Sequence, residues 1–160
     1  MSLARKVVSI LVPLVTLVGC DHVTKYAAKA ELESQPPREL ISSVLELRYV
    51  ENTDVGFGLL RWVPEGVRRP LLLVMGALAI GALVVMLLQR SATLATKVAL
   101  VLILGGALGN YLDRLGRGYV VDFIHLRHWP VFNAADVWLS AGLVLMALIA
   151  LRSGRQPSPA

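Results

Sequence analysis

Two aspartates near the end of the chain have the residue type and the setting for acid–base chemistry. Asp122 stands in the apolar segment 120–124, and Asp136 stands where the last long hydrophobic run begins. A carboxylate at the edge of a bilayer is costly to keep charged, and ionisable side chains in such places usually serve a function. If the fold brings the two carboxyl groups together, they can share one proton and activate a water molecule between them. That is the chemistry of an aspartic protease.

A third aspartate, Asp113, competes with Asp122 for a place in this pair, because nothing in its spacing excludes it. Asp113 follows Asn110 by three positions, so the two side chains share one face of a helix. Arg114, next to them, can pair with a carboxylate or hold a lipid phosphate. Structural roles also fit: Asp113 can cap a helix at the membrane interface, Asp122 can pair with an arginine, and Asp136 can favour a helix start through the helix dipole.

The elements that carry these residues must lie in a membrane. Of the 160 residues 56% are hydrophobic and the mean hydropathy is +0.64, above the usual range for a soluble globular protein. Residues 70–89 carry no charge over 20 positions, about the length that spans a hydrocarbon core. We therefore predict a single integral membrane domain over residues 1–160.

Four hydrophobic segments predict four transmembrane helices, because a lone spanning segment must satisfy its own backbone hydrogen bonds. We expect these helices at residues 7–28, 70–88, 92–112 and 135–151. The polar loop at residues 29–69 contains an alternating, β-prone segment at 44–50, which predicts a strand. The predicted fold is a membrane all-α protein with a small β element in an extracytoplasmic loop between the first two helices.

The distribution of charge predicts how the chain is oriented. The net charge of +5 does not indicate a nucleic-acid partner, because the basic residues are scattered between hydrophobic runs with no basic stripe. None of the eleven acidic residues lies in the N-terminal tail, the turn at 89–97 or the C-terminal tail. Those three segments carry basic residues only, namely Arg5, Lys6, Arg90, Lys97, Arg152 and Arg155. The positive-inside rule then places both termini in the cytoplasm.

The N-terminal segment resembles the signal peptide of a lipoprotein. Residues 1–20 have a basic start, an apolar core and a lipobox-like end at Leu17-Val18-Gly19-Cys20. Three further hydrophobic segments follow, which favours reading Cys20 as a small apolar residue of the first helix. As the single cysteine of the chain, it excludes an internal disulfide and a multi-cysteine metal site.

A metal site built on His125 and His128 is the weaker alternative for this region. Three aspartates are near these histidines in the sequence. However, a spacing of three in a loop does not aim two imidazoles at one point. We therefore expect no metal.

Five motifs in order make the chain resemble the bacterial lipoprotein signal peptidase family, also called signal peptidase II. The match covers most of the chain, and four spans are interleaved with the motifs as in that family. The motifs are Asp21-His22-Val23-Thr24-Lys25, Asn52-Thr53-Asp54-Val55-Gly56-Phe57-Gly58, Gly109 to Arg114, Val120 to Phe123 and Phe132 to Asp136. The chain departs from the family pattern at three positions, since glutamine, glycine and alanine usually stand where it has His22, Asp54 and Gly56.

The resemblance implies an intramembrane aspartic endopeptidase with Asp122 and Asp136 as the catalytic pair. One carboxylate would act as general base toward a water molecule, while the other, protonated, polarises the scissile carbonyl. Supporting roles are implied for seven more residues. Asn110, Arg114 and Asn133 would orient the pair or the substrate, Asp21 and Lys25 would brace the outer end of the first helix, and Asn52 and Phe57 would belong to a flap.

The resemblance also implies the substrate and the location. The substrate would be a prolipoprotein that carries diacylglyceryl on its lipobox cysteine, and cleavage would fall just before that cysteine. The enzyme would be a monomer in the bacterial cytoplasmic (inner) membrane, in contact with membrane lipid, with its active site toward the extracytoplasmic face. Neither a cofactor nor a metal is implied.

Two other function classes share some of these features. A proton or ion transporter also uses intramembrane carboxylates, but usually at mid-span and with paired repeats, neither of which is seen here. A non-catalytic membrane scaffold would keep its function after both aspartates became asparagine. We prefer the protease interpretation because the carboxylates lie near segment ends and the five motifs occur in order.

Overall fold

Four long helices form the body of the protein. The structure, a computed structural model, describes residues 3–54, 58–89 and 91–153. Within that part each of the four helices is long and apolar enough to cross a membrane: α1 (Leu3–Leu32), α2 (Glu65–Leu88), α3 (Leu94–Gly116) and α4 (Ala134–Ser153). The predicted membrane all-α fold with a small β element is confirmed.

The helices are longer than the predicted spans. Helix α1 continues through the first residues of the predicted loop to Leu32, and α2 begins at Glu65 rather than at Pro70, which lies inside it. Helix α3 continues past residue 112 to Gly116. The physical reason is that hydropathy reports the thickness of the hydrocarbon core, whereas polar turns beyond the core remain helical in the headgroup region.

A three-stranded antiparallel sheet stands at one end of the helices. Its order is β1 (Arg38–Ile41), β2 (Leu45–Asn52) and β3 (Val120–Leu126). The strand predicted at 44–50 is β2. The third strand comes from the connection between α3 and α4, so the sheet joins two loops that are far apart in the sequence. Its register pairs Val50 with Asp122 and Asn52 with Val120, which brings the end of β2 beside Asp122.

Helix α3 is the centre of the bundle, because it packs against each of the other three helices. A buried cluster of Leu87, Leu100, Val101 and Leu104 joins α2 to α3. Two glycines of α3 permit close packing against α1. A Cβ added at Gly105 would lie 2.9 Å from Leu17, and one added at Gly109 would lie 2.5 Å from the carboxylate of Asp21.

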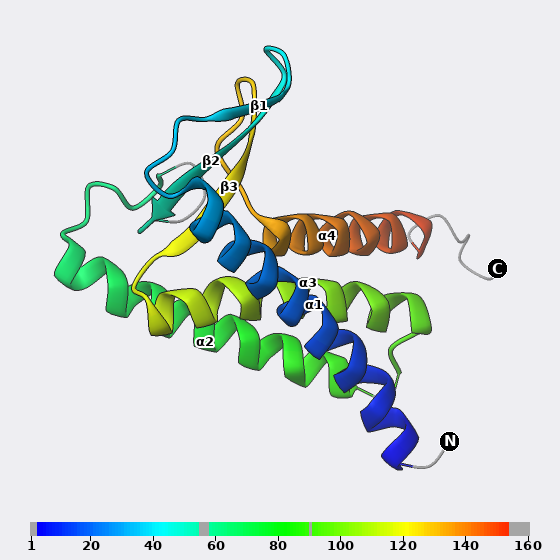
Figure 1. Cartoon of the computed structure of the whole chain (residues 1–160). Helices are drawn as coiled ribbons and strands as arrows, with labels where there is room; N and C mark the ends of the chain where they lie inside the picture. The colour runs from blue at the N-terminus through cyan, green and yellow to red at the C-terminus, as the bar shows by residue number, and fades with distance from the viewer. Residues whose placement is uncertain (1–2, 55–57, 90, 154–160) are drawn as a thin grey trace.

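The two ends of the bundle are different. Figure 1 shows the sheet at the end where α1 and α3 finish and where α2 and α4 begin. The opposite end holds the start of α1, the end of α4 and the connection between α2 and α3. Every motif residue from β2, β3 and the start of α4 therefore lies at the sheet end, as does the C-terminal part of α3.

Candidate active site

The structure brings Asp122 and Asp136 together on either side of one asparagine. The side-chain Nδ2 of Asn133 donates to Oδ1 of Asp122 at 2.6 Å, and the backbone N–H of Asn133 donates to Oδ2 of Asp136 at 3.0 Å. Asp122 is only 3% exposed, whereas Asp136 is half-buried. The carboxylate of Asp122 is thus shielded from water, whereas that of Asp136 remains accessible to water.

Asp136 is held where it is by the way α4 begins. The Oδ1 of Asn133 accepts the backbone N–H of Asp136 at 3.1 Å, while Asp136 accepts the backbone N–H of Asn133 in return. This reciprocal pair is a capping box, which satisfies two backbone donors at the start of the helix. The helix dipole there favours a negative side chain. The helix-start role weighed for Asp136 is therefore real, and it fixes the position of the carboxylate.

Asp122 is held from the sheet side by Asn52. The Nδ2 of Asn52 donates to Oδ2 of Asp122 at 2.8 Å, and the Oδ1 of Asn52 accepts the backbone N–H of Asp54 at 2.9 Å. Burial raises the pKa of Asp122 to about 6; the hydrogen bonds from Asn52 and Asn133 oppose this, and the charge of Asp136 adds to it. Asp122 therefore keeps a proton at pH values where an ordinary aspartate has lost it.

This raised pKa predicts how stability depends on pH. An aspartate with a pKa near 3.8 in the unfolded chain and about 6 in the folded protein favours folding most below pH 4, and this contribution is lost as pH rises through 6. Between pH 4 and pH 7 the free energy of unfolding of the wild type should fall by about 2 kcal/mol relative to Asp122→Asn. Chemical unfolding in micelles at both pH values measures this difference. A difference independent of pH would contradict the burial argument.

Asn110 reaches the pair from α3. Its Nδ2 donates to Oδ1 of Asp136 at 2.8 Å, and its Oδ1 accepts from Nδ2 of Asn133 at 3.1 Å. The same Oδ1 accepts from Nζ of Lys25 at 3.0 Å. The two aspartates are therefore joined by a continuous network of amide groups contributed by α3, the sheet and the start of α4.

Asp113, the rival for the catalytic pair, faces a different partner. Its Oδ2 lies 2.9 Å from Nζ of Lys25, which also lies 2.7 Å from Oδ2 of Asp21. All three side chains are buried at 0% to 1% exposure. Asp21 in turn accepts the backbone N–H of Ala135 at 2.9 Å. The pair predicted to brace α1 thus also contacts the first turn of α4.

The remaining predicted residues lie around this centre. Arg114 donates to the backbone carbonyls of Asp54, at 2.7 Å, and Asn110, at 3.3 Å, so it fastens the segment after β2 to α3. This contact could not be predicted from the sequence, because its acceptors are backbone carbonyls, which every residue has. The predicted flap residue Phe57 lies outside the described residues.

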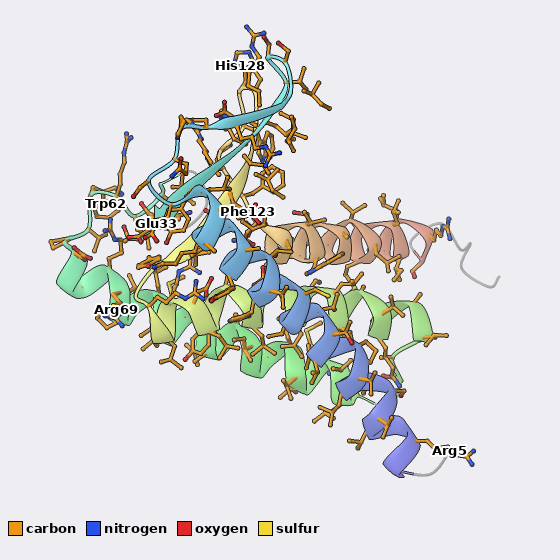
Figure 2. The ribbon with its side chains drawn as sticks, viewed as in Figure 1. Arg5, Glu33, Trp62, Arg69, Phe123 and His128 are labelled. Carbon is orange, nitrogen blue, oxygen red and sulfur yellow. The ribbon has the colours of Figure 1, made fainter. Side chains whose placement is uncertain are left out.

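The histidines considered for a metal site are not brought to the aspartates. His125 Nδ1 lies 2.8 Å from Glu46 across the β2–β3 pair. Figure 2 shows His128 at the far tip of the sheet, whereas Phe123, the neighbour of Asp122, lies where the sheet meets the helices. Among residues 3–54, 58–89 and 91–153, no three metal-ligating side chains gather at one point.

Comparison with known proteins identifies the family. A family model described as Signal peptidase (SPase) II matches residues 13–152. The chain belongs to the signal peptidase II family. The resemblance drawn from five motifs is thereby confirmed, and membership in the signal peptidase II family supports a membrane protease that removes signal peptides from prolipoproteins.

Individual relatives of the signal peptidase II family match nearly the whole chain. A lipoprotein signal peptidase of Moorella thermoacetica is 34% identical over 148 residues, which are 88% of this chain and 94% of that protein. One of Thermodesulfovibrio yellowstonii is 38% identical over 149 residues, 91% of this chain and 95% of that protein. A solved bacterial membrane enzyme, determined by the in meso method at 2.3 Å resolution, has a TM-score of 0.80 at 27% identity, covering 95% of this chain and 94% of that one.

Proposed function

We propose that this chain is an intramembrane aspartic endopeptidase that cleaves diacylglyceryl-modified prolipoproteins just before the lipidated cysteine. The observation that carries the proposal is the carboxylate pair, Asp122 and Asp136, bridged by Asn133 at the end of four membrane-spanning helices. Family membership supplies the substrate class, because the relatives carry the name lipoprotein signal peptidase. No metal or cofactor is needed for this chemistry.

The unequal environments of the two aspartates support an assignment of roles. Asp136 is half-buried, stands at a helix N-terminus and accepts two N–H donors, so its carboxylate is positioned to act as the general base that takes a proton from water. The resulting hydroxide oxygen attacks the scissile carbonyl. Asp122 is buried and has a raised pKa, so it is the better suited of the two to hold the proton that polarises that carbonyl. When the C–N bond breaks, a proton passes from the pair to the leaving amine of the lipidated cysteine.

The direction of the chain in the membrane follows from charge. Helix α1 begins, α3 begins and α4 ends at the bundle end opposite the sheet (Figure 1), and these helix ends carry Arg5, Lys97 and Arg152. The positive-inside rule places that end in the cytoplasm. In this arrangement both termini are cytoplasmic, and the active site faces the extracytoplasmic side of the bacterial inner membrane, where the substrate's diacylglyceryl group is anchored in lipid. The residues of the proposed site all belong to one chain, so a monomer is sufficient for the proposed reaction.

A gel-shift cleavage assay in detergent micelles tests the proposed function. Wild-type protein is incubated with a prolipoprotein carrying the diacylglyceryl group and with the same prolipoprotein without it. Only the lipidated form should shift to the size of the processed product. Equal cleavage of both forms would contradict the substrate assignment, and cleavage of neither form would contradict the protease assignment.

A further inference from the structure

A buried lysine on α1 contacts the amide network of the aspartates from outside it. We propose that Lys25 is a positioning residue for the reaction, acting on Asp136 through Asn110. The inference rests on the proposed function and deepens it. Lys25 is 0% exposed, and its Nζ lies 3.0 Å from Oδ1 of Asn110, whose Nδ2 donates to Asp136 at 2.8 Å. The lysine is therefore one residue removed from a reacting carboxylate.

The ammonium group of Lys25 determines whether the oxygen or the NH₂ group of the Asn110 side chain faces Asp136. A side-chain amide has an acceptor end and a donor end, whereas a lysine ammonium has donors only. With Lys25 on one side, the oxygen of Asn110 must face Lys25 and its NH₂ group must face the carboxylate. The reversed amide would set two donors against each other at Lys25 and two acceptors against each other at Asp136.

Without Lys25 this orientation would be held less firmly. The other donor to Oδ1 of Asn110 is Nδ2 of Asn133, at 3.1 Å. That same Nδ2 makes its shorter contact, 2.6 Å, with Asp122. That NH₂ group has one hydrogen for each of these contacts, so Asn133 also favours this orientation of Asn110, and Lys25 adds the closer and charged contact to the same oxygen.

Lys25 has a second path to the same carboxylate through Asp21. Its Nζ pairs with Oδ2 of Asp21 at 2.7 Å, while Oδ1 of Asp21 accepts the backbone N–H of Ala135, the residue before Asp136. The space for this carboxylate exists because position 109 is glycine, where an added Cβ would lie 2.5 Å from Oδ2 of Asp21. One buried cation therefore orders both the donor to Asp136 and the helix turn that carries it.

A double-mutant cycle on Lys25 and Asn110 separates positioning from simple structural support. Lys25→Gln keeps one donor group and removes the charge. It should lower kcat on the lipidated substrate by on the order of 10- to 100-fold, the usual cost of losing an outer partner that orients a reactive group, with KM changed by less than about threefold. In an Asn110→Ala background the same change should lower kcat by a factor several times smaller, because the path through Asn110 is already cut and only the contact through Asp21 remains.

Lys29→Gln is the matched control. It makes the same change one helical turn later on α1, at a lysine that is 41% exposed and pairs with Glu33 at 3.6 Å, outside the network of Asn110. Its kcat should stay within about threefold of wild type. Melting temperatures of all variants show whether each is folded, and Lys25→Met, which removes both the charge and the donors at similar length, replaces Lys25→Gln if the latter does not fold.

Two results would overturn the inference. One is a Lys25 variant that keeps the wild-type kcat. The other is an equal loss of kcat in the wild-type and Asn110→Ala backgrounds, which would mean that Lys25 does not act through Asn110. Either result, obtained with a wild type that cleaves the lipidated substrate, would leave the proposed function standing. A wild type without cleavage would instead remove the proposed function itself.

Discussion

Replacing either Asp122 or Asp136 by asparagine should lower kcat by about 10³- to 10⁴-fold, the upper range for the loss of a positioned general acid or base. Asparagine has nearly the shape of aspartate but cannot exchange a proton with water or with the leaving amine. In the structure each carboxylate has its own set of donors, from Asn52 and Asn133 or from Asn110 and Asn133, so neither can replace the other. Steady-state cleavage of lipidated prolipoprotein measures the effect.

The control for this prediction is Asp113→Asn, since Asp113 is the third aspartate of the region and lies against Lys25. It should lose far less kcat than Asp122→Asn or Asp136→Asn, because Asp113 lies outside the hydrogen bonds of the two carboxylates. The assignment of the pair would be wrong if Asp113→Asn abolished turnover in a folded protein while Asp122→Asn left turnover intact. Circular dichroism and a melting curve for each variant show that loss of activity is not loss of fold.

The second large effect is expected at Asn133, which contributes to both carboxylates. Asn133→Ser should lower kcat by on the order of 10²-fold while leaving the melting temperature near that of the wild type. Serine caps a helix about as well as asparagine, so α4 keeps its start. It lacks the Nδ2 group that now donates to Asp122 and Asn110 at 2.6 and 3.1 Å.

A second variant, Asn133→Ala, separates the effect of losing the amide donor from the effect of losing the helix cap. Alanine removes the amide donor and the helix cap together, so this variant should lose activity and also about 1 kcal/mol of stability. Asn133→Ser and Asn133→Ala should therefore have similar kcat values and different unfolding midpoints. If serine restored full activity, the side-chain donor would have no part in the reaction and Asn133 would act only as a cap.

The sequence predicts the parts of this protein that depend on composition and short spacing. The uncharged run at 70–89 predicts a membrane span because lipid tolerates few charges, and the alternation at 44–50 predicts β2 because strands have a period of two. Helix ends are less predictable. Nothing in hydropathy shows that α2 starts at Glu65 or that α3 ends at Gly116, since both turns lie among charged residues.

The residues of the candidate site also differ in how far the sequence predicts their positions. The motif around Phe132 to Asp136 predicts a helix start, and the structure has a capping box there. The spacing of Asp113 and Asp122 in the sequence could not show which of them lies near Asp136. That depends on the rotation of α3 about its own axis and on the register of β3 against β2. The network from Lys25 to Asn110 spans 85 positions, and such a contact is fixed only by how α1 packs on α3.

A single-turnover experiment with enzyme in excess over lipidated prolipoprotein tests whether Asp122 and Asp136 cleave the bond before the lipidated cysteine. Wild type, Asp122→Asn and Asp136→Asn are compared, and the products are identified by mass spectrometry. We expect a released signal peptide ending at the residue before the lipidated cysteine, formed by wild type and absent with both folded variants. Cleavage at another bond, or formation of this product by either variant at the wild-type rate, would contradict this expectation.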